Sequence, residues 1–332
     1  MLDRESETTP LEYPPCPGCG NEDIPPPLVY ETSVYSEGFT VGLSRCPRCD
    51  VYFTRPRLAR HNVRTREAEY EQIKRKYESE ARSGRFHKNQ NYRYYLGLAE
   101  SHLRQRGAAT PYRVLDIGSH CGFFVRFARE LGWDARGIEP AGPMVRFARE
   151  INGLETIEQG LFDERSCEGE SFHLITMFDV LEHIPDPVKL LRAVHSRLVP
   201  GGLVLCKVPH IRFYVAWRRF VMALSAIGVL PRYPTYLAEP PAEAKTSTVP
   251  PLFDLFEHVV HYDDAAVARI FRQADFSSTS TLPAPPTNAR GDYLNLPRSL
   301  TYGMAREAFR LGYRPDRLMH GLLIVGYREG KA

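Results

Sequence analysis

Apolar residues follow two different spacings along the chain, and these spacings predict its elements. From residue 113 onward, short apolar runs of strand length alternate with segments whose apolar residues recur every three or four positions, as in an amphipathic helix. The predicted strands cover residues 113–117, 135–138, 156–158, 172–178, 202–208, 277–282 and 321–327. The predicted helices cover residues 123–131, 143–151, 188–198, 211–230, 263–274 and 297–311. This alternation indicates an α/β fold, a doubly wound and mostly parallel sheet with helices on both faces.

Three further segments precede or interrupt the alternation. Residues 1–55 are rich in Pro, Gly and Cys and show no helical spacing, so we expect a small module held together by something other than an apolar core. Residues 56–110 have the pattern of a helical connector. Residues 211–250 are expected to form an inserted lid that packs on the functional site. The α/β domain then comprises residues 111–210 and 251–332.

Two of these segments carry features that can bind a partner. Residues 45–110 contain 16 Lys and Arg against 7 Asp and Glu, with tyrosines among them. We interpret this charge as the solvated face of a helix, with a role in holding an anionic substrate as the alternative. The helix predicted at residues 211–230 is apolar but too short to span a bilayer. We therefore expect it to pack as a lid, with interfacial membrane contact as the alternative.

The composition narrows the class of protein. A chain of 332 residues with 43% apolar side chains can bury a large core, which excludes a disordered or collagen-like chain. The 43 Lys and Arg nearly balance the 40 Asp and Glu, so binding to nucleic acid or to an anionic membrane by bulk charge is not expected. The first thirty residues lack the pattern of a secretion signal, and no window is apolar enough to span a bilayer. We therefore expect a cytoplasmic protein.

Four of the seven cysteines form two close pairs. Cys16 and Cys19 are separated by two residues, as are Cys46 and Cys49, and 26 residues lie between the pairs. A C-x-x-C turn directs both sulfurs at one ion, and two such turns complete the tetrahedral thiolate shell that Zn²⁺ prefers. Four protein ligands leave no open coordination position, so the predicted zinc is structural.

A Gly-containing turn joins the first predicted strand to its helix. Ligands of doubly wound sheets bind at this position, beyond the carboxyl ends of the strands. A dinucleotide fingerprint would place Gly at residues 118, 120 and 123, whereas the chain has Gly118, His120 and Phe123, which disfavours NAD. Asp116 at the end of the strand would repel a pyrophosphate and suits a cationic group.

A second acidic residue, Glu139, closes the next strand, 17 residues after Gly122. A carboxylate at this position accepts two hydrogen bonds from a ribose diol. The predicted ligand therefore has a ribose and a positive charge and lacks a diphosphate.

The residues at these positions resemble a known family, the class I S-adenosylmethionine-dependent methyltransferases, and in particular bacterial members with an N-terminal zinc-ribbon-like module. The resemblance extends from Cys16 to about Phe276 and includes the last strand. It rests on the Cys pairs and on the segments 114–122, 137–140, 177–187 (MFDVLEHIPDP), 198–202 (LVPGG) and 257–262 (EHVVHY). It implies a Rossmann-like methyltransferase sheet and S-adenosylmethionine as cofactor.

The resemblance also implies roles for individual residues. The methionine part of the cofactor would lie beside Asp116, Gly118, Ser119 and Gly122, and the ribose beside Glu139 and Pro140. The adenine would lie beside Leu161 and Phe162, and the sulfonium end beside Phe178 and Asp179.

Two residues depart from the family pattern. His120 replaces the middle Gly of the first motif, so either the loop lies further from the ligand or the imidazole points away from it. His173 replaces the Asp common before the fourth strand, at a position that we expect to lie outside the pocket.

The titratable residues near the mouth of the sheet are candidates for catalysis. Methyl transfer from a sulfonium is an in-line displacement, and a base is needed only if the acceptor must lose a proton. The candidates are His183, His258, His261 and Tyr262. Imidazole has a pKa suited to proton abstraction near neutrality, so one of the histidines is the predicted base.

The acceptor is less defined than the cofactor. The resemblance includes sugar C-methyltransferases, so we expect a small-molecule or glycan-type acceptor, such as a nucleotide sugar, methylated on carbon or oxygen. One alternative is a nucleic-acid-associated protein that uses the zinc module and the basic connector. A second alternative, prompted by His120, is a methyltransferase fold that only binds ligands.

Overall fold

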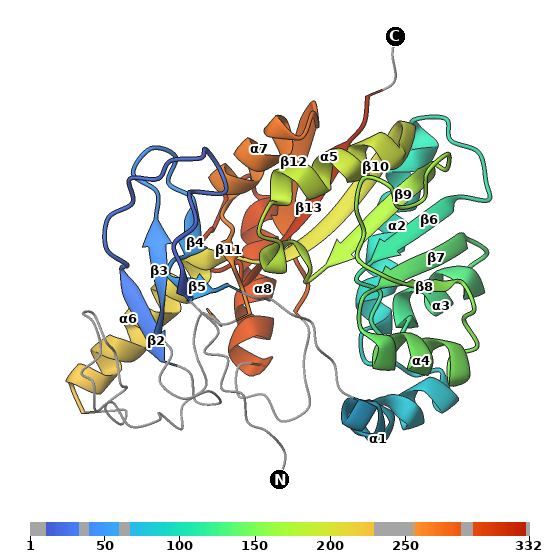
Figure 1. The fold of residues 1–332 in the computed structure, drawn as a ribbon, viewed down its shortest axis with the longest axis horizontal. Coiled ribbons are helices and arrows are strands. Elements are labelled where there is room, and N and C mark those ends of the chain that lie inside the picture. The colour runs from blue at the N-terminus through green and yellow to red at the C-terminus, as the bar shows by residue number, and fades with distance from the viewer. Residues whose placement is uncertain are drawn as a thin grey trace.

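The structure is a computed structural model and describes residues 11–32, 40–59, 67–228, 255, 257–286 and 295–329. Figure 1 shows a large sheet flanked by helices and, beside it, a smaller group of strands near the N-terminal end of the chain. The predicted α/β fold is confirmed.

The large sheet has seven strands in the order β12-β13-β10-β9-β6-β7-β8. Five of them, from β8 to β10, pair in parallel, and β13 and β12 pair antiparallel at one edge. The strands are β6 (Arg113–Ile117), β7 (Asp134–Glu139), β8 (Ile157–Gln159), β9 (Phe172–Phe178), β10 (Leu198–Pro209), β12 (Ser278–Pro283) and β13 (Gly321–Tyr327). All seven lie at the predicted positions, with ends shifted by no more than a few residues. Their apolar character is nearly continuous because helices cover both faces.

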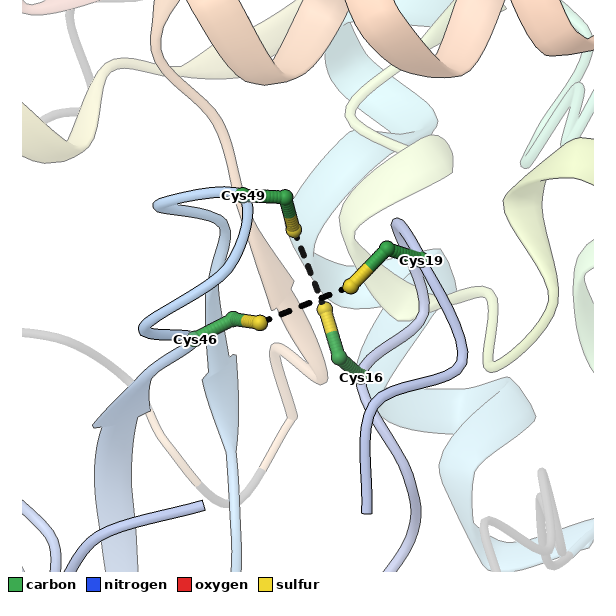
Figure 2. A group of neighbouring side chains, drawn as sticks. All are labelled: Cys16, Cys19, Cys46 and Cys49. Carbon is green, nitrogen blue, oxygen red and sulfur yellow. Dashed lines mark hydrogen bonds between the residues drawn. The ribbon is translucent and has the colours of Figure 1, made fainter. Parts of the chain in front are cut away.

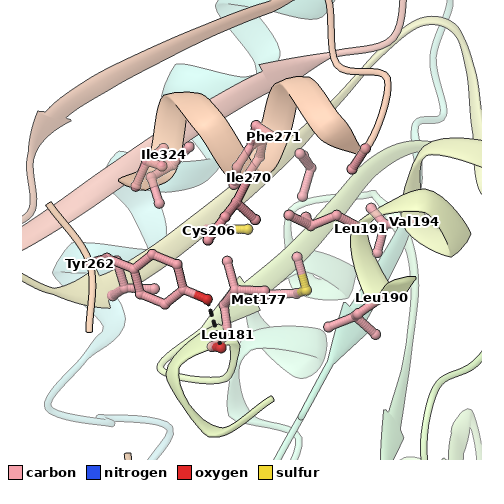
Figure 3. Close-up of a cluster of buried hydrophobic side chains, with 14 of the residues drawn as sticks. Met177, Leu181, Leu190, Leu191, Val194, Cys206, Tyr262, Ile270, Phe271 and Ile324 are labelled. Atoms are coloured by element: carbon pink, nitrogen blue, oxygen red, sulfur yellow. Dashed lines mark hydrogen bonds between the residues drawn. The ribbon is translucent and has the colours of Figure 1, made fainter. Parts of the chain in front are cut away.

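Helices cover the two faces of this sheet in separate groups. One face packs against α1 (Glu67–Ser83), α2 (Asn89–Gln105), α3 (Phe123–Glu130) and α4 (Gly142–Glu150). The other face packs against α5 (Pro187–Arg197) and α7 (Asp264–Gln273). Figure 3 shows this second core, in which Met177 and Cys206 of the sheet meet Leu191 of α5 and Phe271 of α7. Helices α1 and α2, which lie in the predicted connector, contribute buried residues to the first core.

The N-terminal part forms two small sheets. One pairs β1 (Leu11–Glu12) with β5 (Arg57–Leu58), and the other has the order β11-β4-β3-β2. The second contains β2 (Val29–Thr32), β3 (Thr40–Arg45), β4 (Tyr52–Thr54) and β11 (Val260–His261). Strand β11 comes from the C-terminal third of the chain and pairs with β4, so the cysteine-rich module and the α/β domain share a sheet.

The start of the predicted lid is helix α6 (Ile211–Ala226), which is shorter than the expected 211–230. Ile211 is buried in one apolar cluster with Val29, Val41 and Leu43 of the N-terminal sheet. Figure 1 shows α6 running past β2 and β3. The rest of the predicted insertion, residues 229–250, lies outside the described residues. Across the part of the chain that the structure describes, no helix combines the length and apolar character needed to cross a membrane.

Candidate active site and cysteine cluster

The turn after β6 takes its shape from two glycines in the left-handed region. Gly118 has φ +72° and Gly122 has φ +75°, conformations that L side chains rarely adopt. A Cβ on Gly118 would lie 2.5 Å from Cγ2 of Val180, and one on Gly122 would lie 2.6 Å from Cδ1 of Leu154. Both glycines are therefore required by the backbone conformation and by the close packing of the turn.

Glu139 holds this turn from the end of β7. One carboxylate oxygen accepts a hydrogen bond from the backbone N–H of His120 at 2.8 Å, and the other accepts from Ala141 at 2.9 Å. Burial raises the pKa of Glu139, and the two N–H donors oppose that rise. Each oxygen keeps a second lone pair, so the carboxylate can still accept from a ribose diol.

The imidazole of His120 points toward helix α1. The residue has φ +51°, a left-handed conformation that Gly adopts more readily than other residues. Its ring packs edge-on against Tyr77 of α1, with 5.5 Å between the ring centroids. His173 lies at the start of β9, at the end of the strand opposite Phe178 and Asp179, where its Nδ1 accepts from the backbone N–H of Arg113 at 3.0 Å.

Two polar groups beside the turn are buried. Asp116 is 4% exposed and accepts a hydrogen bond from the Thr176 hydroxyl at 2.6 Å. Burial, with a contribution from the nearby Glu139 charge, raises the pKa of Asp116 to about 7. The Ser119 hydroxyl is also buried and has no hydrogen-bond partner among the described residues. A buried polar atom of this kind is normally satisfied by a ligand or water, so this side of the turn fits a polar ligand.

At the end of β9, an aromatic ring and an ion pair lie next to each other. Phe178 stacks on Tyr95 of α2, with ring centroids 4.6 Å apart. Asp179 accepts from the Lys207 ammonium at 2.8 Å and 2.9 Å. Burial by itself would raise the pKa of Asp179, but the charges of Lys207 and Lys88 outweigh it and lower the pKa. Sequence reasoning missed Lys207 because nothing in the apolar run of its strand indicates which neighbour it faces.

The remaining residues of the predicted cofactor site follow β7 and β8. Pro140 directly follows Glu139 and is partly buried. The backbone N–H of Gly160 donates to the carbonyl of Glu139 at 3.0 Å, which brings the segment after β8 beside the acidic residue. In that segment Leu161 is 71% exposed and Phe162 is buried.

One turn beyond Asp179, the short helix η1 (Leu181–His183) brings Glu182 and His183 next to His258. Potential ligand atoms of these three residues all lie within 4.8 Å of one another. The rings of His183 and His258 are 4.9 Å apart, and Nδ1 of His183 lies 2.9 Å from the Glu257 carbonyl. Glu182 is buried, whereas both histidines are partly exposed.

The other two predicted catalytic residues have different surroundings. His261 is buried, its Nε2 lies 3.2 Å from the Thr54 hydroxyl, and burial next to His258 lowers its pKa to about 3. Tyr262 is fully buried in the core of Figure 3, where its hydroxyl donates to the Leu181 carbonyl at 3.1 Å. The structure thus brings His183 and His258 together at the surface and places His261 and Tyr262 behind them.

Thr54 connects this group to the cysteine-rich module. Its hydroxyl donates to the His258 carbonyl at 2.6 Å, and its backbone N–H donates to the Val259 carbonyl at 3.0 Å. The pairing of β4 with β11 continues the same contact. Sequence reasoning missed Thr54 because the two segments lie about 200 residues apart.

The four cysteines of the two C-x-x-C turns meet at one point, as Figure 2 shows. Sγ of Cys16 lies 3.4 Å from Sγ of Cys49, and Sγ of Cys19 lies 3.5 Å from Sγ of Cys46. These distances are too long for disulfides. Four thiolates at about 2.3 Å from one zinc ion lie about 3.8 Å apart, so the arrangement fits a tetrahedral Cys₄ site. Burial raises the pKa of Cys16 and raises that of Cys49 to about 11, and a bound ion would instead hold the thiols deprotonated.

The strand order of the large sheet and the acidic turn are typical of a Rossmann-like methyltransferase fold. The profile of a family described as "Methyltransferase domain" matches residues 86–281, more than half of the 332 residues. The chain therefore belongs to this methyltransferase family.

Curated relatives match over a shorter segment. The ubiquinone biosynthesis O-methyltransferase of Ruegeria pomeroyi is 36% identical over 110 residues, which are 31% of this chain and 44% of the relative. The protein of the same name from Xanthomonas campestris is 34% identical over 107 residues, which are 30% of this chain and 44% of the relative. The chain thus spans less than half the length of these curated relatives.

Solved structures are similar over a larger share of the chain. The magnesium protoporphyrin IX methyltransferase of Synechocystis, with bound SAH, is 12% identical and covers 74% of this chain and 85% of its own, with a TM-score of 0.42. An S-adenosylmethionine-dependent methyltransferase from Mesorhizobium loti is 18% identical and covers 65% of this chain and 91% of its own, with a TM-score of 0.40.

Proposed function

We propose that this methyltransferase acts on an oxygen of a small-molecule acceptor that carries a hydroxyl group. The observation that carries this proposal is the position of the partly exposed pair His183 and His258, one turn beyond Asp179 at the sulfonium end of the expected cofactor site. The names of the curated relatives, which are O-methyltransferases, also support transfer to oxygen.

The acidic residues at the ends of β6 and β7 would hold the cofactor. Asp116 would face the ammonium of its methionine part, because a buried carboxylate next to a cation regains the charge that burial disfavours. Glu139 would accept from the ribose hydroxyls while its N–H contacts keep the turn in place. Gly118, Ser119 and Gly122 would line the methionine part, and Pro140, Leu161 and Phe162 would surround the ribose and adenine.

Positioning carries most of the expected rate enhancement, since the reaction is an in-line displacement. When bound, S-adenosylmethionine supplies an activated methyl group on a positively charged sulfur. Phe178 and the Asp179–Lys207 pair would fix the acceptor side of that sulfur, because the ion pair joins the ends of β9 and β10. His183 and His258 would lie beside the acceptor oxygen, with His261 and Tyr262 supporting them from the core.

We also propose that the four cysteines hold a structural zinc ion. A Cys₄ site has no open position, so the ion would contribute stability and not chemistry. Its place in the mechanism would be to fix β3 and β4, and through Thr54 the backbone of His258.

A nucleic-acid acceptor has less support. The connector tyrosines Tyr70, Tyr92 and Tyr95 are buried in the core, so they are not available to stack on bases. Several connector arginines pair within their own helix, as Arg82 does with Glu78 and Arg104 with Glu100. Salt-dependent binding of single strands by the purified protein would overturn this preference.

Transfer of labelled methyl groups tests the proposed function. The protein is incubated with methyl-labelled S-adenosylmethionine and a metabolite extract of the source cells, and the products are separated into small molecules, lipids and macromolecules. We expect label in a small molecule. Because the methyl group is attached to oxygen as an ether, chemical cleavage of that ether should release the label. Glu139→Ala should abolish the label, and Glu158→Ala, an exposed glutamate on the neighbouring strand β8, should retain it. Label in nucleic acid, or no label while the cofactor binds, would refute the proposal.

A further inference from the structure

We propose that Glu182, His183 and His258 bind a divalent transition-metal ion, at a site separate from the four cysteines. Two imidazoles and one carboxylate form the donor set of many metal sites that keep open coordination positions. The inference deepens the proposed function, because it states how the acceptor oxygen is bound.

The separation of the donor atoms fits one ion. Ligand nitrogen and oxygen atoms lie about 2.1 Å from such an ion, so two of them are at most about 4.2 Å apart. The three donor atoms here all lie within 4.8 Å of one another. Side-chain shifts of less than 1 Å, well within the range of small rotamer adjustments, would therefore complete the contacts.

Hydrogen bonds behind the cluster orient the donors. Nδ1 of His183 lies 2.9 Å from the Glu257 carbonyl, so it carries the proton and leaves Nε2 free to bind an ion. Histidines that bind metals usually donate their second N–H to a carbonyl or carboxylate in this way. The backbone of His258 is held by Thr54, and the N–H of Val259 donates to the Glu182 carbonyl at 2.8 Å. These contacts fix both segments that supply ligands.

Burial of the acidic member agrees with a cationic ligand. Glu182 is 1% exposed, and a carboxylate this deeply buried is generally accompanied by a cation or a metal. The two histidines are partly exposed, so an ion at the cluster would be reached from the acceptor side. The cysteine cluster differs, because its four thiols would fill the coordination shell of an ion and leave no position for an acceptor.

An ion at this site gives the histidines a role other than that of a base. An imidazole bound to a metal cannot take up the acceptor proton at the same nitrogen. The acceptor hydroxyl would bind at an open position of the ion and release its proton to solvent, because a bound cation lowers the pKa of an attached hydroxyl. The resulting oxyanion forms the new C–O bond as the C–S bond breaks, and the electron pair of that bond stays on sulfur, which becomes a neutral thioether.

Zinc content measured by equilibrium dialysis against buffered Zn²⁺ tests the inference on the full chain. We expect two zinc ions per wild-type chain and one in His183→Ala and His258→Ala. His195→Ala, on α5, where the ring packs against Phe276, is the matched control and should keep two. As a second probe, Mn²⁺ is added to protein that already holds one zinc ion, and the loss of the free-ion electron paramagnetic resonance signal is followed. Thiolates disfavour Mn²⁺, so this probe reports on the histidine cluster.

The variants must remain folded for these counts to be decisive. Circular dichroism and the affinity for S-adenosylhomocysteine should be the same in all of them, and Glu182→Gln serves as a third variant that preserves volume. One zinc per wild-type chain together with no Mn²⁺ binding would overturn the inference, as would binding that the three variants leave unchanged. Two bound ions without methyl transfer would leave the metal site standing and refute only the proposed function. Methyl transfer that continues unchanged when the second ion is absent would refute the role of this ion in binding the acceptor and leave the proposed function intact.

Discussion

Replacing Asp116 with Asn should make the cofactor-free protein more stable and the cofactor less tightly bound. Burial raises the pKa of Asp116 from 3.8 to about 7, so the folded chain holds a proton there that the unfolded chain has lost. Stability therefore falls as the pH rises from about 4 to 7, by about 1.4 kcal/mol per pH unit, and the full cost above pH 7 is about 4 kcal/mol. Asparagine avoids this cost and can still accept the hydrogen bond from Thr176.

Denaturant unfolding, followed by circular dichroism at pH 6, 7 and 8 with constant zinc, measures the first effect. The variant should exceed the wild type most at pH 8, and the difference should shrink as the pH falls below 7. Calorimetry with S-adenosylhomocysteine at pH 8 measures the second effect, where loss of a charged hydrogen bond weakens binding by about 10- to 100-fold. Asp134→Asn, at the exposed start of β7, is the control and should change neither quantity. A stability difference that does not vary with pH, or an unchanged affinity, would refute the reasoning.

Three further predictions concern the turn and the cysteine cluster. Cys46→Ser should abolish methyl transfer while S-adenosylhomocysteine still binds, because loss of the zinc ion would release Thr54 from His258. Turnover and calorimetry measured in parallel check this, and retained turnover would contradict it. Gly118→Ala should destabilise the fold by about 2–4 kcal/mol in thermal unfolding, since it combines φ +72° with a clash against Val180, and adding Val180→Ala should restore part of the loss. Glu139→Gln should weaken cofactor binding at least tenfold in the same calorimetry, because an amide N–H₂ would face one of the two backbone N–H donors.

Local patterns were sufficient to predict the sheet and the Gly-containing turn after β6. Each strand and helix of the α/β domain covers few residues, and its apolar spacing depends only on which face is buried. The two glycines, Asp116 and Glu139 lie in one strand–turn–helix–strand unit, so their approach follows from the handedness of that unit. The cysteine pairs are similar, because a C-x-x-C turn brings its two sulfurs together whatever surrounds it.

Contacts between distant segments were decided only by the tertiary structure. Strand β11 joins the N-terminal sheet, Thr54 holds His258, and Lys207 pairs with Asp179, and none of these partners has a local signal. The same holds for the difference between the partly exposed His258 and the buried His261, since His261 lies in β11, which pairs with β4, and His258 precedes that strand. The sequence determines which residue types are available at each position. Burial and charge pairing depend on which segments the fold brings together, and burial and charge pairing decide what each side chain can do.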